Sequence, residues 1–247
     1  MAFPKEAFLT HNWQMGEASG TRADLVGGMT LTDNNTVGSA AGLVYPLAAN
    51  LIAANSEYLS HADDASLRIV GATTFEVWAR WTSGTNAPLF CKRGATNEYE
   101  SGYYSGYGGM YLDVLSGGSL SSARSPLVPV SGTWYHLVMW YDPADRKARI
   151  AVNGGAVAAG AALPGAPNVS AAAFAICRDL AAYWNGDIGP ARMWNTLLDA
   201  ADRTALYNGG AGLAYPSTST PTLSIYGAKF GHKQVAHGGG MRYGDAS

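Results

Sequence analysis

Charged residues are scarce in this sequence. Lys, Arg, Asp and Glu make up 14% of its 247 residues, and the formal net charge is −2. No more than two basic residues stand side by side, so the sequence offers no basic run that would attract nucleic acid. Hydrophobic residues make up 47% of the chain, which is enough for a sizeable core and is not typical of a disordered polymer. We therefore predict a globular protein without a nucleic-acid partner.

Long hydrophobic runs are also missing. The longest apolar stretch, LVYPLAANLIAA, is too short to cross a bilayer and is broken by Pro46 and Asn50. The N-terminal stretch MAFPKEAFLTHNW has no basic start, apolar run and small-residue cleavage site in succession, so it does not read as a signal peptide. We expect a protein made in the cytoplasm that has no membrane partner.

Cysteine is nearly absent. Cys91 in PLFCKR and Cys177 in FAICRD both stand in apolar surroundings, which favours two buried thiols. A disulfide between them stays open, because sequence alone does not place their Cα atoms within bonding range. No Cys/His spacing indicates a zinc site.

What the sequence does contain is repeated alternation with a period of two residues, which is typical of half-buried strands. Residues 73–81, TTFEVWARW, put Phe75, Val77, Ala79 and Trp81 on one face of a predicted strand. Residues 132–155 predict a hairpin with one turn at PADR and a second turn at Asn153-Gly154. Further strands are predicted within 11–15, 58–70, 87–93, 109–115 and 172–179. The fold class is therefore all-β, an antiparallel two-sheet sandwich.

Four segments, in this order, resemble the laminin-G-like (concanavalin A-like) jelly-roll family. They are residues 11–34, 55–81, 132–155 and 185–210, and the resemblance covers roughly residues 5–215. It implies a jelly-roll sandwich with one short C-terminal helix. We accordingly expect one laminin-G-like domain over residues 1–215 and an extended C-terminal tail over residues 216–247.

The last of these segments predicts both a strand and the helix. In GDIGPARMWN, the resemblance implies that Ile188, Ala191 and Met193 or Trp194 pack inward. Asp199 is placed to cap the helix, and Gly209 is placed to end it in a left-handed conformation. We expect the helix to cover one open edge of the sandwich, with its packing face formed by Leu197, Leu198, Ala201, Leu206 and Tyr207.

The tail differs in composition from the domain. PSTSTPT is typical of a linker, and the residues that follow are rich in glycine and poor in core-forming side chains. We expect the tail to dock on a neighbouring subunit, with a small domain of its own as the alternative.

A catalytic site is not evident, and we predict no enzyme. Glycoside hydrolases need two facing carboxyl groups, and the nearest approach is Glu98 with Glu100 in TNEYES. Both are interpreted as solvated loop carboxylates. His136 lies in an alternating strand and is interpreted as a strand residue with a hydrogen-bond partner. The sequence has no Gly-x-Ser-x-Gly nucleophile motif and no phosphate-binding glycine loop before a helix.

No cofactor is predicted, but a calcium ion at the rim of the sandwich is possible because many laminin-G-like domains carry one. Asp33, Asp63 and Asp64 stand in oxygen-rich turns that resemble such sites. Adjacent Asp and Asn residues are also ordinary turn formers, so both interpretations stay open.

Tyrosines in the segment YESGYYSGYGGMY are the most conspicuous candidates for binding. Tyrosine among glycine and serine provides a large amphipathic contact area. The segment could stack on sugars, contact a protein, or fold over its own core, and Trp184 could join the same surface or close the core. The candidate residues are Tyr99, Tyr103, Tyr104, Tyr107, Tyr111 and Trp184.

Three functional hypotheses follow. The first is a non-catalytic virion surface protein of a bacteriophage, a capsid decoration or tail-associated subunit, because an extracellular type of fold without a secretion signal fits a particle released by lysis. Its partners would be protein subunits, including copies of itself, and its location the virion or the extracellular space. The second is a carbohydrate-binding lectin module, and the third, less favoured, is a glycoside hydrolase.

Overall fold

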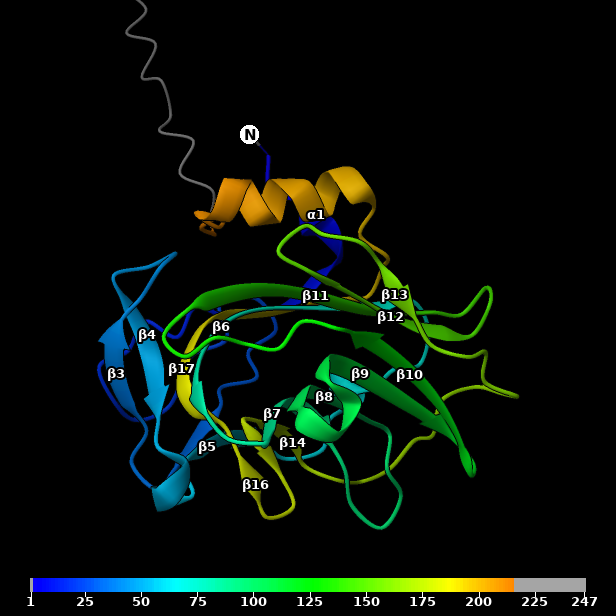
Figure 1. Cartoon of the computed structure of the whole chain (residues 1–247), viewed down its shortest axis with the longest axis horizontal. Helices are drawn as coiled ribbons and strands as arrows, with labels where there is room; N and C mark the ends of the chain where they lie inside the picture. Colours follow the sequence, from blue (N-terminus) through cyan, green and yellow to red (C-terminus); the bar gives the residue numbers. More distant parts are fainter. Residues whose placement is uncertain (1, 216–247) are drawn as a thin grey trace, which may run out of the picture.

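The computed structural model describes residues 2–215 and shows two antiparallel β-sheets packed face to face, with one short α-helix over one of them (Figure 1). The predicted all-β jelly-roll sandwich is confirmed. The strands are β1 (Leu9–Trp13), β2 (Thr32–Asn34), β3 (Gly38–Ala41), β4 (Leu47–Leu51), β5 (Tyr58–His61), β6 (Thr73–Ser83), β7 (Asn86–Lys92), β8 (Tyr99–Tyr104), β9 (Gly109–Ser116), β10 (Ser119–Ser125), β11 (Trp134–Asp142), β12 (Lys147–Val152), β13 (Ala158–Ala159), β14 (Phe174–Ile176), β15 (Arg178–Asp179), β16 (Ala182–Tyr183) and β17 (Asn185–Trp194), and the helix is α1 (Ala200–Tyr207).

The two large sheets interleave segments from the whole length of the domain. One sheet has the order β13-β12-β11-β6-β17-β4-β3, with β1 also paired to β17, and the other has the order β10-β9-β8-β7-β14-β5-β2. We call them the eight-stranded and the seven-stranded sheet. The short β15–β16 hairpin forms a separate two-stranded sheet.

Side chains that alternate along the strands fill the space between the sheets. Phe75, Val77 and Ala79 of β6 belong to the main core, as the alternation predicts, and Trp81 packs against it. Ile188, Ala191 and Met193 of β17 lie in the same core. Phe75 meets Phe90 and Tyr99 of the opposite sheet at ring-centroid distances of 5.3 Å and 5.1 Å. The side chains on the inner faces of both sheets therefore pack in the core, so only the outer faces are left for a ligand.

The predicted central hairpin is present as β11 and β12. The two strands are joined by the predicted turn at residues 143–146. The chain leaves β12 through the second predicted turn, where Asn153 and Gly154 have left-handed φ angles of 52° and 66°. The Asn153 side-chain oxygen accepts a hydrogen bond from the backbone N–H of His136 at 2.8 Å, which fixes the turn to the start of β11.

The helix has the predicted N-terminal cap. The Asp199 carboxylate accepts from the backbone N–H of Asp202 at 3.0 Å, and Asp202 returns the bond to the N–H of Asp199, so the two form a capping box. The helix ends one residue earlier than predicted, because Asn208 already has left-handed geometry with φ 47°, and Gly209 follows with φ 62°. Asparagine tolerates this geometry better than most residues.

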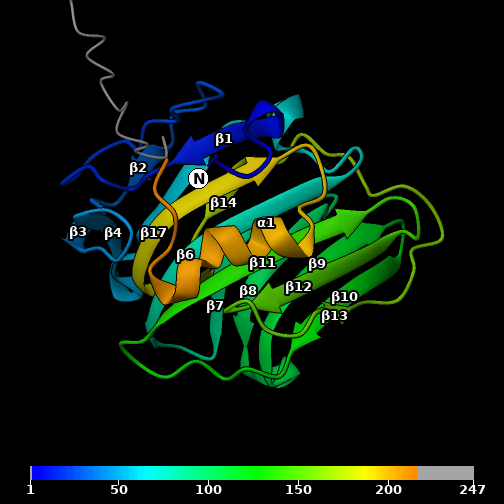
Figure 2. The ribbon, with the colours of Figure 1, turned by 90° about the horizontal axis from the view of Figure 1, so that it is seen from above.

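The predicted position of the helix is wrong. The helix does not cover an edge of the sandwich but lies across the outer face of the eight-stranded sheet, over β6 and β11 (Figures 1 and 2). The Tyr207 ring stacks on Trp78 at 6.0 Å, and the Arg203 guanidinium lies 4.6 Å from the centre of the Trp140 ring. Large aromatic side chains on the outward face of β6 and β11 require this cover, since they would otherwise expose a wide apolar surface.

A fully buried ionic network lies on the outer face of the eight-stranded sheet, the face that α1 covers. The Glu76 carboxylate accepts from Arg192 Nη1 at 2.7 Å and lies 3.0 Å from His136 Nε2. Arg192 also donates to the backbone oxygen of Leu213 at 2.8 Å. The interpretation of His136 as a strand residue with a hydrogen-bond partner is confirmed. The network joins β6, β11, β17 and the segment after the helix.

Both cysteines are free, buried thiols, as predicted. Within residues 2–215, no helix is both long and apolar enough to cross a bilayer. The predicted tail, residues 216–247, and its docking on a neighbouring subunit lie outside the described residues.

We predict that Glu76→Gln lowers the free energy of unfolding by about 3 kcal/mol, because it leaves the Arg192 guanidinium buried without a counter-charge. Urea-induced unfolding measures the change. Asp145→Asn, which removes a carboxylate from a solvent-facing pair with Arg149, is the control and should cost less than about 1 kcal/mol. Equal effects of the two substitutions would show that the buried network does not stabilise the fold.

Candidate functional site: the outer face of the seven-stranded sheet

Among the described residues, no α-helix covers the outer face of the seven-stranded sheet (Figure 1). Strand pairing is in register across this face, so outward side chains line up in a row perpendicular to the strands. From β10 to β2, the row runs through Ser122, Asp113, Glu100, Cys91, Ala175, Ser60 and Thr32. The side chains of this row are acidic on β9 and β8 and small on β14 and β5.

An arginine ties the middle of this row to the β15–β16 hairpin. Arg93 Nη1 donates to Asp179 at 2.9 Å and to the carboxylate of Glu100. The Cys91 thiol lies below, 3.6 Å from the other oxygen of Asp179. Two neighbouring segments, with Arg93 and Glu100, and a distant one, with Asp179, thus supply one compact group of two carboxylates, one guanidinium and one thiol.

Burial shifts the ionisation of the acids on this face. The pKa of Glu100 is raised to about 7 by burial and by the neighbouring Asp179 carboxylate, against the opposing effect of Arg93. Burial also raises the pKa of Asp113, although hydrogen bonds from Ser122 and Tyr107 work in the opposite direction. A raised pKa means that a protonated Glu100 can donate a hydrogen bond as well as accept one.

Three tyrosines border the acidic end of the row. Tyr107 meets Tyr104 and Tyr111 edge to face, with ring centroids 5.0 Å and 5.2 Å apart. The guanidinium of Arg124 lies 3.6 Å from the centre of the Tyr107 ring, and the Tyr107 hydroxyl donates to Asp113 at 3.2 Å. Tyr104 is the most exposed of the three, with 39% of its surface accessible.

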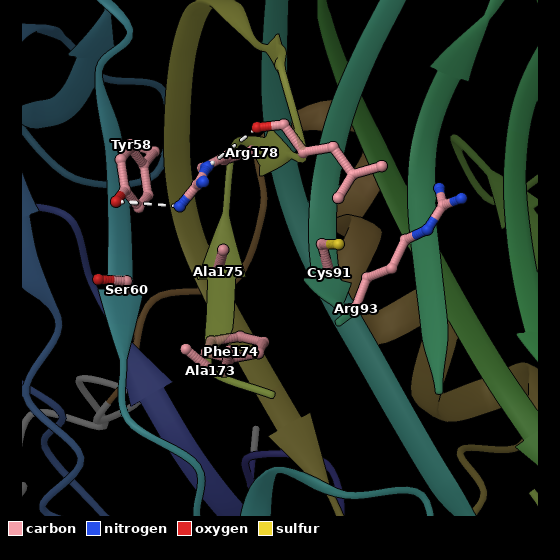
Figure 3. Close-up of a pocket in the computed structure, with 9 residues that line it drawn as sticks. Tyr58, Ser60, Cys91, Arg93, Ala173, Phe174, Ala175 and Arg178 are labelled. Carbon is pink, nitrogen blue, oxygen red and sulfur yellow. Dashed lines mark hydrogen bonds between the residues drawn. The ribbon is translucent and has the colours of Figure 1, made fainter. Parts of the chain in front are cut away.

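Three pockets on this face share Arg93. Two of them, of about 180 Å³ and 200 Å³, also share Glu100 and Tyr107. The third, of about 150 Å³, lies between β5, β14 and the β15–β16 hairpin, with Tyr58, Ala175 and Arg178 among its lining residues (Figure 3). Aromatic faces beside carboxylate, guanidinium and hydroxyl groups suit a ligand rich in hydroxyl groups.

The tyrosines predicted as candidates divide between the two sides of the sheet. Tyr104 and Tyr107 reach the surface of the outer face, and Tyr111 lies on the same side but is buried, with 3% of its surface exposed. Tyr99 and Tyr103 point into the core and are buried, which does not fit their predicted role as binding residues. The reason is the pleat, because Tyr99 and Tyr103 stand an even number of residues apart on β8 and share its inner face.

Trp184 and Glu98 are also buried. Trp184 is fully buried in the main core, so of its two predicted roles the structure supports closing the core. The prediction that Glu98 is a solvated loop carboxylate is wrong, because Glu98 is buried in an ion pair with Lys92 at 2.9 Å. Glu100 is not a loop residue either, since it lies on β8.

The principal residues that sequence analysis missed are Arg93, Asp113, Asp179 and Arg178. Asp113 carries a usable signal, because it alternates with Leu112 and Val114 in a predicted strand and must therefore face outward. Asp179 and Arg178 carry none, since only the folded hairpin places them over β7, where β15 and β16 pack.

The possible calcium ligands do not gather into one site. Asp33 accepts from the backbone N–H of Val37, Asp63 pairs with Arg68 and Lys92, and Asp64 caps the short 3₁₀ helix 65–67. Within residues 2–215, no group of three or more His, Cys, Asp or Glu side chains is arranged to hold a metal ion. These turns do not fit a calcium ion held by several carboxylates, and calcium binding stays a prediction.

Glu100 should make the stability of the protein depend on pH. Its pKa is about 7 in the folded chain against an ordinary 4.5, so its stabilising contribution is complete below pH 4.5 and is lost as the pH rises through 7. Between these limits, the wild type should lose on the order of 2 kcal/mol of unfolding free energy relative to Glu100→Gln. Urea unfolding of both proteins from about pH 4.5 to about pH 8 measures this difference. A difference that does not change with pH would contradict the raised pKa.

Comparisons with known structures agree with the described fold. Domain 4 of AbnA, an extracellular arabinanase of Geobacillus stearothermophilus solved with arabinotriose, superposes with a TM-score of 0.61 at 18% identity, over 79% of this chain and 96% of that one. The binding domain of Paraclostridial Mosquitocidal Protein 1 gives a TM-score of 0.68 at 11% identity, over 83% of this chain and 52% of that one. At these identities the likeness concerns the fold.

A third similar structure is the binding domain of botulinum neurotoxin DC, solved in complex with SialylT, with a TM-score of 0.61 at 11% identity, over 81% of this chain and 51% of that one. The chain thus spans about half the length of the two toxin binding domains. No curated protein sequence matches it. The family model for the concanavalin A-like lectin/glucanases superfamily, of the laminin-G type, matches residues 53–202, which is more than half of the sequence. The chain belongs to this family.

Proposed function

We propose that this protein is a carbohydrate-recognition module that binds a glycan on the outer face of its seven-stranded sheet. The observation that carries the proposal is the group of Glu100 and Arg93 beside Tyr104 and Tyr107, on a face that no described α-helix covers. Sugars are commonly held by stacking on aromatic rings and by hydrogen bonds to charged side chains, and this face provides both kinds of group. The solved complexes of similar folds with arabinotriose and SialylT are consistent with it.

We propose further that binding is not followed by hydrolysis. Glycoside hydrolysis needs one carboxyl group that donates a proton and a second that faces the same bond. Glu100 and Asp113 are cross-strand neighbours, but Asp113 is 2% exposed and its carboxylate is held by Tyr107. Glu100 is engaged by Arg93. A reducing-sugar assay on any glycan that binds tests this point, and release of new reducing ends would contradict it.

We predict that Tyr104→Ala weakens glycan binding about tenfold while the thermal midpoint of unfolding changes little, because Tyr104 is exposed and its ring is available for stacking. A glycan array followed by isothermal titration measures the change. Phe8→Ala removes an aromatic ring that is 49% exposed but lies outside this face, and it serves as the matched control. Equal affinity of wild type and Tyr104→Ala for every bound glycan would place the site elsewhere.

As a separate function, we propose that the protein assembles with other protein subunits, such as those of a virion, through residues 216–247. Tyr215, the last described residue, packs edge to face on Phe3 at 4.8 Å, in the cluster that contains Leu198 and Leu206 of the helix side. The chain thus leaves the described domain beside the helix, while the open face lies on the other sheet (Figure 2). We propose that residues 216–247, which follow this point in the sequence, carry the contact with a virion or another oligomer.

Removal of the residues after Pro216 should abolish assembly and leave glycan binding unchanged. Electron microscopy and light scattering of the full chain and the truncated chain measure the first effect, and the glycan array measures the second. A truncated protein that still assembles would contradict the role of the tail.

A further inference from the structure

Arg178 occupies an unusual position on the open face. It lies on β15, and its guanidinium donates to Leu180 O at 3.2 Å and to the Tyr58 hydroxyl at 3.1 Å, above the Tyr58 ring (Figure 3). These acceptors are neutral, whereas Arg93 has two carboxylate partners. Within residues 2–215, Arg178 forms no salt bridge. A guanidinium has five N–H donors, and these two contacts leave donors for a ligand.

The hairpin that carries Arg178 is held rigidly. Cys177 N donates to Leu89 O at 2.7 Å, Trp184 N donates to Cys177 O at 3.0 Å, and the side chains of Cys177 and Trp184 are buried in the core. Cys177 and Leu180 adopt left-handed backbone geometry, with φ of 72° and 50°. Such geometry is uncommon for residues other than glycine and is retained where the surrounding structure enforces it. The guanidinium is therefore presented from a preformed support.

The pocket beside Arg178 has a small, open floor. Ala173, Ala175 and Ser60 contribute small side chains to its lining, while the Tyr58 ring packs against the guanidinium itself (Figure 3). Ser60 Oγ accepts from Asn34 at 2.9 Å, which leaves the Ser60 hydroxyl proton for an acceptor on a ligand. Arg93 lines the opposite side, and its charge is already matched by Glu100 and Asp179.

We propose that this pocket binds the anionic group of an acidic sugar, a carboxylate or a sulfate ester, between Arg178 and Ser60. The inference rests on the proposed glycan-binding function and adds the class of ligand. The remainder of the glycan extends over Arg93 towards Glu100 and the tyrosines, because the pockets on this face share Arg93. A guanidinium is suited to this role, since its paired N–H groups match the oxygens of a carboxylate or a sulfate.

The test is an array of acidic glycans, each printed beside its neutral parent, with uronic, sialic and sulfated members in separate groups. The full-length wild type should bind at least one acidic glycan about tenfold more tightly than the neutral parent, and Arg178→Gln should abolish that preference. Arg146→Gln, which removes the same charge from the β11–β12 turn, is the control and should keep the preference. Thermal unfolding verifies that both variants fold.

The outcomes separate this inference from the function on which it rests. Equal binding of acidic and neutral members, or an acidic preference that survives in Arg178→Gln, overturns the inference and leaves carbohydrate recognition standing. Binding to no member of the array overturns both. A preference confined to carboxylates or to sulfates supports the inference and identifies the anion.

Discussion

The alternation of side chains between the two faces of each strand governs this structure. In a two-sheet sandwich, the inner faces of both sheets are used for the core, and every second residue must find another environment. On β6, the inner positions Phe75 and Val77 are apolar, but the outer positions include Glu76 and Trp78, which are also buried. A second layer is needed on that side, and α1 supplies it. The asymmetry between a covered and an open face follows from this one property.

The covered face shows what burial of polar groups requires. Glu76 and Arg192 lose their contact with water, and each is compensated by the other and by further hydrogen bonds to His136 and Leu213. On the open face, Arg93 is matched by Glu100 and Asp179 in a similar way, but the group stays partly accessible. Ion pairing thus stabilises the packing of α1 on the covered face. On the open face, the same kind of pairing orders polar side chains that stay partly accessible to solvent.

Most of the fold was predictable from the sequence, because the period of two and the turn residues are local signals. The strand 73–81, the hairpin that turns at residues 143–146 and the cap at Asp199 are all present. The position of the helix was not predictable, since it depends on Trp78 and Trp140 facing outward on adjacent strands of a sheet whose order is set by distant segments. The alternation of residues 73–81 puts Trp78 on the face opposite Phe75 and Val77, but nothing local indicates which element covers it.

The site was less accessible to sequence analysis for a related reason. The segment YESGYYSGYGGMY stands out by its tyrosine content. Because side chains alternate along β8, however, Tyr99 and Tyr103 lie in the core and Tyr104 lies on the surface. The charged partners are Arg93 just after β7, Asp113 on β9 and Asp179 on a hairpin 86 residues beyond Arg93. Only strand register brings Asp113, Glu100 and Cys91 into one row. A face assembled in this way changes character when one strand shifts by a single residue, because every side chain of that strand then exchanges faces. The Glu100–Asp113 and Glu100–Cys91 pairings are therefore the structural condition for any ligand to be recognised there.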